Sequence, residues 1–130
     1  MISFVRDKKN RFPGGLPFEK ALGRVLGRKY ELEVIFVPKG KMKSLNKTYR
    51  NKPRTTNVLS FSLDKKHGQI FFDAEFIKKE AKDLKTTFSA RFWRLFLHGI
   101  LHLKGLDHIK PNEAKQMKLA ESRLLKIFPY

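Results

Sequence analysis

The stretch HGILHLKGLDH, residues 98–108, holds three of the four histidines of the chain at a spacing that suits a metal ion. On a helix, His98 and His102 lie four residues apart on one face, so both imidazoles can point toward a common position. The third ligand must come from outside that face. Gly105 can adopt a positive φ, end the helix and let the chain bring His108 beside the other two. Three histidines and an open fourth position are typical of catalytic zinc sites.

The residue after the first histidine, Gly99, limits which reactions a metal at this site could catalyse. Zinc peptidases with this histidine spacing carry a glutamate there, which takes a proton from the attacking water and passes it to the leaving amine. This chain has Gly99, which cannot do so. A peptidase is therefore disfavoured, whereas RNA, whose 2′-hydroxyl can act as a nucleophile, stays open as a substrate. The alternative is structural: His98 and His102 are hydrogen-bonded core histidines, and His108 caps a helix or lies on the surface.

Positive charge is the second chemical feature. The chain has 29 Lys and Arg against 12 Asp and Glu, a net charge of +17, which predicts a polyanionic partner such as nucleic acid. A generally basic surface without a specific partner is the alternative. Residues 39–54 include seven basic residues and no acidic one. Arg50 could hold a phosphate through its planar guanidinium. The other residues that we assign to RNA binding are Lys41, Lys43, Lys47, Lys52 and Arg54.

Composition bounds the class of protein. We expect one domain over residues 1–130, because 130 residues with 41% hydrophobic content can bury a core. Absence of cysteine excludes disulfides and thiolate ligands, so a metal depends on His, Asp and Glu. Neither a secretory signal nor a membrane-spanning run is evident in the sequence, so we expect a cytoplasmic protein that does not enter a membrane.

Hydrophobic periodicity predicts nine elements. The predicted strands cover residues 2–5, 30–37, 57–63 and 69–73, and the predicted helices cover 18–26, 40–49, 73–85, 89–104 and 112–127. This order favours an α/β (α+β) fold, with a small mixed four-stranded sheet covered by about five helices and a metal-binding helix like that of zincins. We expect burial at Ile2, Phe4, Leu32, Val34 and Phe36 in the first two strands, and at Phe92, Trp93, Phe96, Ile100 and Met117 in the last two helices.

Two motifs also resemble a known family. HGILHLKGLDH is similar to the signature of the YbeY family, bacterial endoribonucleases that are also called ribosomal RNA maturation factors. LNKTYRNKPRTTNVLSF, residues 45–61, resembles the second signature of that family. With GQIFFD, the resemblance covers most of residues 45–121. Gly99 is normal for the family, whereas Gln69 and Leu106 depart from its usual Asp and Tyr.

The resemblance implies one Zn²⁺ ion held by His98, His102 and His108, with Arg50 lining the cleft and needed for activity. It implies metal-dependent cleavage of single-stranded RNA in the 3′-end maturation of 16S ribosomal RNA and in ribosome quality control. The expected partners are single-stranded RNA, ribosomal RNA and the small ribosomal subunit. Zinc would act as a Lewis acid while Arg50 balances phosphate charge. The alternatives are a ribosome-assembly factor with a structural metal and, less favoured, a metallopeptidase.

Overall fold

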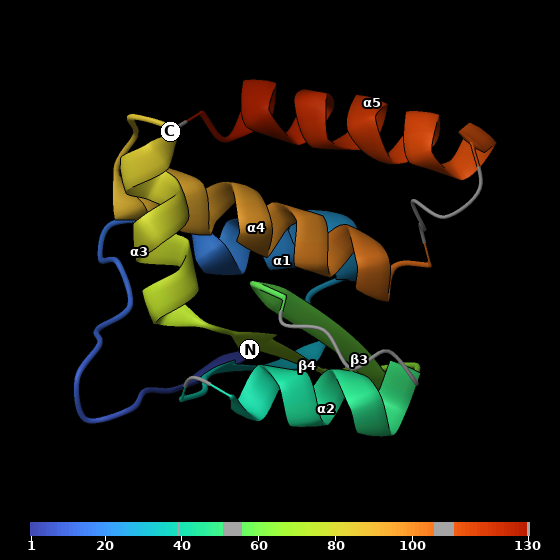
Figure 1. The fold of residues 1–130 in the computed structure, drawn as a ribbon. Helices are drawn as coiled ribbons and strands as arrows, with labels where there is room; N and C mark the ends of the chain where they lie inside the picture. Colours follow the sequence, from blue (N-terminus) through green and yellow to red (C-terminus); the bar gives the residue numbers. More distant parts are fainter. Residues whose placement is uncertain (39, 51–55, 106–110, 130) are drawn as a thin grey trace.

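The computed structural model describes residues 1–38, 40–50, 56–105 and 111–129 (Figure 1). These residues form four strands and five helices, in the order that the sequence predicts, so the α+β fold is confirmed. The elements are β1 (Ile2–Val5), α1 (Phe18–Leu26), β2 (Glu31–Phe36), α2 (Lys41–Arg50), β3 (Val58–Asp64), β4 (His67–Phe72), α3 (Ala74–Asp83), α4 (Phe88–Leu103) and α5 (Pro111–Ile127).

The four strands form one mixed sheet in the order β1-β2-β4-β3. β2 pairs in parallel with β1 and with β4, so Leu32 lies between Ile2 and Gly68. β3 and β4 are antiparallel and are joined by a tight turn, with Val58 opposite Phe72. β1 and β3 are therefore the two edges of the sheet.

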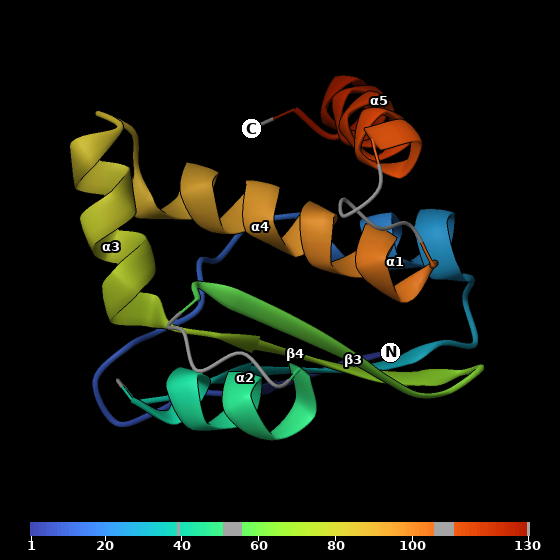
Figure 2. The same cartoon turned by 45° about the vertical axis from the view of Figure 1, so that its right-hand side comes forward.

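Helices cover both faces of the sheet (Figures 1 and 2). α4 and α1 lie over one face, α2 lies over the other, and α5 crosses α4 on the side away from the sheet. Because side chains alternate along a strand, Val34 and Ile70 point into the main core under α4, where both are fully buried. Ile35 and Phe71 point to the α2 face, against the buried Met42.

The first strand is less buried than we predicted. Phe4 is 42% exposed, although Leu32, Val34 and Phe36 of β2 are buried as expected. Phe4 pairs with Val34 and so shares its face, but it lies on an edge strand with a neighbour on one side only. Its ring contacts Phe12 and Phe18, with centroids 4.9 and 5.3 Å away, and its other side stays open.

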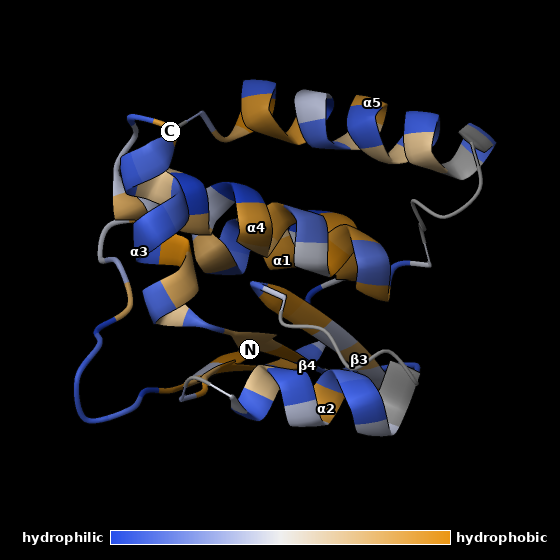
Figure 3. Ribbon diagram, viewed as in Figure 1, coloured by the Kyte–Doolittle hydropathy of each residue, from blue (hydrophilic) through white to orange (hydrophobic). Residues whose placement is uncertain are grey.

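α4 is the central helix and carries two of the predicted metal ligands. Its first turn is capped by Thr87, whose hydroxyl accepts a hydrogen bond from the backbone N–H of Ala90 at 3.0 Å. The helix is largely hydrophobic (Figure 3). The predicted core positions are fully buried: Phe92, Trp93, Phe96 and Ile100. After the helix, Gly105 has a φ of 109°, the positive value that the sequence predicts.

Candidate metal centre

His98 and His102 lie one turn apart on the same side of α4. Their ring centroids are 4.8 Å apart, and both side chains are partly exposed. The predicted third ligand, His108, falls outside the described residues. Among the residues that the structure does describe, no three histidine or acidic side chains gather as a metal-binding group. The geometry described is thus that of a two-histidine pair on one helix.

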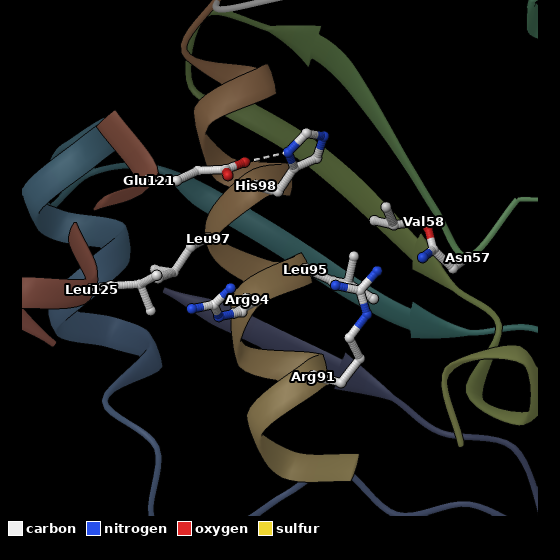
Figure 4. A pocket seen from close by; sticks show the side chains of 9 residues that line it. All are labelled: Asn57, Val58, Arg91, Arg94, Leu95, Leu97, His98, Glu121 and Leu125. Atoms are coloured by element: carbon white, nitrogen blue, oxygen red, sulfur yellow. Dashed lines mark hydrogen bonds and ion pairs between the residues drawn. The ribbon is translucent and has the colours of Figure 1, made fainter. Parts of the chain in front are cut away.

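A carboxylate of α5 contacts the first of these histidines. Glu121 Oε1 accepts a hydrogen bond from His98 Nδ1, and the two side chains are 29% and 26% exposed (Figure 4). When an ionised carboxylate, which only accepts, pairs with a neutral imidazole, the proton is on Nδ1 and the lone pair is on Nε2. Histidines that bind metal commonly donate their other N–H to a carboxylate in this way. The donor set therefore fits an ion such as Zn²⁺, which favours imidazole nitrogen.

Packing of α5 on α4 brings Glu121 to this position. Met117 and Leu124 are buried and lie on the same helical face as Glu121, four residues before it and three after it. The end of the chain is held where Trp93 Nε1 donates to the carbonyl of Phe128 at 3.0 Å. Met117 is 2% exposed, which confirms its predicted role in packing.

Gly99 lies where α4 packs closely against the sheet. A Cβ atom added there would be 2.9 Å from Ile70 Cδ1 and 3.2 Å from Ser60 Oγ. The hydroxyl of Ser60 donates to the carbonyl of Gly99 at 3.2 Å. A glutamate at this position would therefore start against the sheet, where there is no space for it. The missing proton acceptor of the peptidases has a steric reason in this fold.

A pocket of about 300 Å³ opens beside His98, between α4, α5 and the start of β3 (Figure 4). α5 supplies Glu121 and Leu125 to one wall. β3 and the residue before it supply Val58 and Asn57 to the other. The residues of α4 in the lining are Arg91, Arg94, Leu95, Leu97 and His98. The pocket thus joins one predicted metal ligand to two arginines and several apolar side chains.

The basic residues predicted to bind RNA lie elsewhere. Lys41, Lys43 and Lys47 are exposed on α2, which covers the face of the sheet opposite to α4. Lys52 and Arg54 fall outside the described residues, as does the side chain of Arg50, although its backbone ends α2. The structure does not bring the three lysines to His98. One RNA strand that contacts both would have to reach from one face of the sheet to the other.

His67 and Gln69, both in β4, lie away from the histidine pair of α4. His67, the fourth histidine of the chain, is exposed, and its Nδ1 is 2.7 Å from Asp64 Oδ1. The backbone N–H of Lys66 and the imidazole of His67 both bind the Asp64 carboxylate and hold its pKa below the usual range. Gln69 donates from Nε2 to Glu33 Oε1 at 2.7 Å on the α2 face of the sheet. A carboxylate at position 69 would therefore point away from His98.

Three residues that line the pocket beside His98 were not predicted from the sequence: Arg91, Arg94 and Glu121. The two arginines precede His98 by seven and four residues, so helical spacing alone could have placed them on its face. Glu121 had no such signal, because its contact with His98 depends on how α5 packs across α4.

Comparison with known proteins identifies the family. The family model described as Endoribonuclease YbeY matches residues 18–129. The chain belongs to the YbeY endoribonuclease family. Endoribonuclease YbeY of Francisella philomiragia is 30% identical over 95% of this chain and 88% of that protein. The relative from Pelagibacter ubique is 32% identical over 94% and 85%, and that from Aliarcobacter butzleri is 36% identical over 70% and 69%.

Family membership supports an endoribonuclease role, and thus a hydrolase that acts on RNA. The solution structure of TM1509 from Thermotoga maritima has a similar fold, with a TM-score of 0.59 and 24% identity over 97% of this chain and 90% of that one. None of the helices in the described part of the chain has both the length and the apolar character needed to cross a bilayer.

Proposed function

We propose that this chain is a zinc-dependent endoribonuclease that cleaves single-stranded RNA, with His98, His102 and His108 as the metal ligands. Membership in the YbeY family carries the proposal, because its relatives are named endoribonucleases over most of the length of this chain. The paired imidazoles of α4 and the carboxylate behind His98 support the metal site. Ribosomal RNA is the substrate class that we propose, in 16S 3′-end maturation and ribosome quality control.

Each residue has a distinct part in this proposal. A bound ion supplies Lewis acidity beside the scissile phosphodiester. Glu121 would fix the ring orientation and the protonated nitrogen of His98, which leaves Nε2 as the nitrogen that could bind the metal. Arg50 offsets the charge that builds on the phosphate in the transition state. The nucleophile is water or the RNA 2′-hydroxyl, and the ends of the products separate the two: a 2′,3′-cyclic phosphate indicates the hydroxyl.

The space around Gly99 argues against a peptidase. A glutamate base following the first histidine is what these peptidases use, and the contact with Ile70 leaves no room for one here. The net charge of +17 also favours a polyanionic substrate over protein.

Metal analysis paired with a cleavage assay tests the proposal. We expect about one zinc ion per chain in the purified protein and cleavage of a single-stranded oligoribonucleotide. Chelator should stop cleavage, and added Zn²⁺ should restore it. Cleavage that continues without metal would refute the metal role. Intact RNA together with cleavage of an unfolded protein substrate would favour the peptidase.

A further inference from the structure

One side of α4 carries a row of four basic or imidazole side chains. Arg91, Arg94, His98 and His102 follow at intervals of three, four and four residues, the spacing that keeps side chains on one helical face. With about 1.5 Å of rise per residue, Arg94 lies about 6 Å and Arg91 about 10 Å along the helix from His98. The row therefore leads away from the candidate metal centre along the floor of the pocket.

Arg91 is held in place by its neighbours. Its Nη2 donates to Glu80 Oε2 at 3.2 Å, and the other oxygen of Glu80 accepts from Asn57 Nδ2 at 2.7 Å. Arg91 and Glu80 are each 24% exposed, so the guanidinium lies at the wall of the pocket. Its Nε is buried and has no hydrogen-bond partner among the described residues, so this atom is not accessible to a ligand in the pocket. The protein thus orients this guanidinium, and a ligand could be contacted only through its terminal nitrogens.

Arg94 carries a positive charge that no described acidic side chain pairs with. It is exposed and, within the described part of the chain, forms no hydrogen bond or ion pair. The two nearby carboxylates are already engaged, since Glu121 binds His98 and Glu80 binds Arg91. Figure 4 shows Arg94 reaching toward Leu125 of α5 and Arg91 reaching toward Val58 of β3, so the two guanidiniums lie toward opposite walls of the pocket. A guanidinium in this setting matches the geometry of a phosphate group.

We propose that this pocket is an RNA subsite, in which Arg94 on the α5 side and Arg91 on the β3 side contact the phosphates of nucleotides next to the scissile bond. The inference rests on the proposed function and adds to it the path of the strand. Apolar side chains of the lining, Val58 and Leu125 among them, would contact sugars or base faces, while the arginines contact phosphates. These contacts are independent of base identity, so the subsite would position the strand without selecting a sequence.

Length dependence of cleavage tests the subsite. Zinc-loaded protein is assayed on single-stranded oligoribonucleotides of two and of twelve nucleotides, which differ in whether the strand can reach along α4. We expect Arg94→Ala to lower the ratio of kcat/KM for the long substrate to kcat/KM for the short substrate by about tenfold. The change should be mainly in KM, because a contact made equally in the ground state and the transition state affects binding and not kcat. Arg94→Lys should recover part of the ratio, since it keeps the charge but not the planar fork.

The matched control is Arg24→Ala, which removes an exposed arginine of α1 that does not line the pocket. Both variants lose one positive charge, so a difference between them reports position. In Arg94→Ala, but not in Arg24→Ala, loss of one phosphate contact should also change the salt dependence of binding. A plot of the logarithm of the binding constant of the long oligonucleotide against the logarithm of the salt concentration should become less steep by about 0.7. Equal ratios and slopes in the two variants would overturn the subsite. A wild-type protein that cleaves neither oligonucleotide would refute the proposed function, and the subsite with it.

Discussion

Glu121 of α5 and His98 of α4 are hydrogen-bonded across two helices, Oε1 to Nδ1, although 23 residues separate them in the sequence. The contact selects the proton position of an imidazole that we propose as a metal ligand. It also makes the packing of the last helix part of the candidate site.

Glu121→Ala should weaken zinc binding by about 10- to 100-fold, because the carboxylate no longer orients His98. Competition with a chromophoric chelator measures the affinity, and Glu121→Gln should fall between Ala and wild type, since its amide oxygen can still accept. The matched control is Glu75→Ala, which removes an exposed carboxylate of α3. Unchanged affinity in Glu121→Ala would show that the hydrogen bond only joins the helices.

His102→Ala should abolish the rise in melting temperature that zinc gives the wild type. Binding to the folded state alone stabilises it by about 2.7 kcal/mol at a ligand concentration 100 times the Kd. We expect the metal-free variant to stay folded, because His102 is only partly buried. Thermal unfolding with and without chelator measures the effect. The control is His67→Ala, which changes an exposed histidine at the start of β4 and should keep the response to zinc. A variant that cannot fold would favour a structural metal.

Arg50→Ala should leave zinc content unchanged while lowering kcat on single-stranded RNA on the order of 100-fold, as removal of a transition-state donor does elsewhere. Metal analysis and steady-state kinetics separate the two effects. Arg24→Ala, which removes an exposed arginine of α1 outside the predicted RNA-binding residues, serves as the comparison. Loss of zinc from Arg50→Ala would show that our division of roles is wrong.

Two helical glycines should respond in opposite ways to alanine. Gly23→Ala should stabilise the protein by about 1 kcal/mol through helix propensity, since its added Cβ has no neighbour closer than Arg28 Cγ at 3.9 Å. Gly99→Ala gains the same propensity but overpacks Ile70 and Ser60 at a cost of about 1–3 kcal/mol, so we expect net destabilisation. Chemical denaturation measures both variants.

Gly99→Glu restores the sequence pattern of the zinc peptidases but should lose about 3 kcal/mol or more, because a carboxylate would be forced against the buried sheet. We expect no peptidase activity from it. A stable Gly99→Glu protein would contradict the close packing that we describe.

Local periodicity predicted the elements and their order well, because each element buries a face whose repeat is visible in its own residues. The metal pair was predictable for the same reason: His98 and His102 lie on a single helix. Relationships between different elements could not be predicted in this way. The exposure of Phe4 follows from β1 being at an edge, and the separation of the α2 lysines from His98 follows from the face that α2 covers. Neither is encoded in a short window of sequence.

The close approach at Gly99 has a consequence for motion. Because the backbone of α4 packs against Ser60 of β3 and Ile70 of β4 at this point, we expect the histidine pair to be carried by a well-protected part of the molecule. Amide hydrogens around His98 should exchange with solvent only through global unfolding, so this half of the site would persist until the whole core opens.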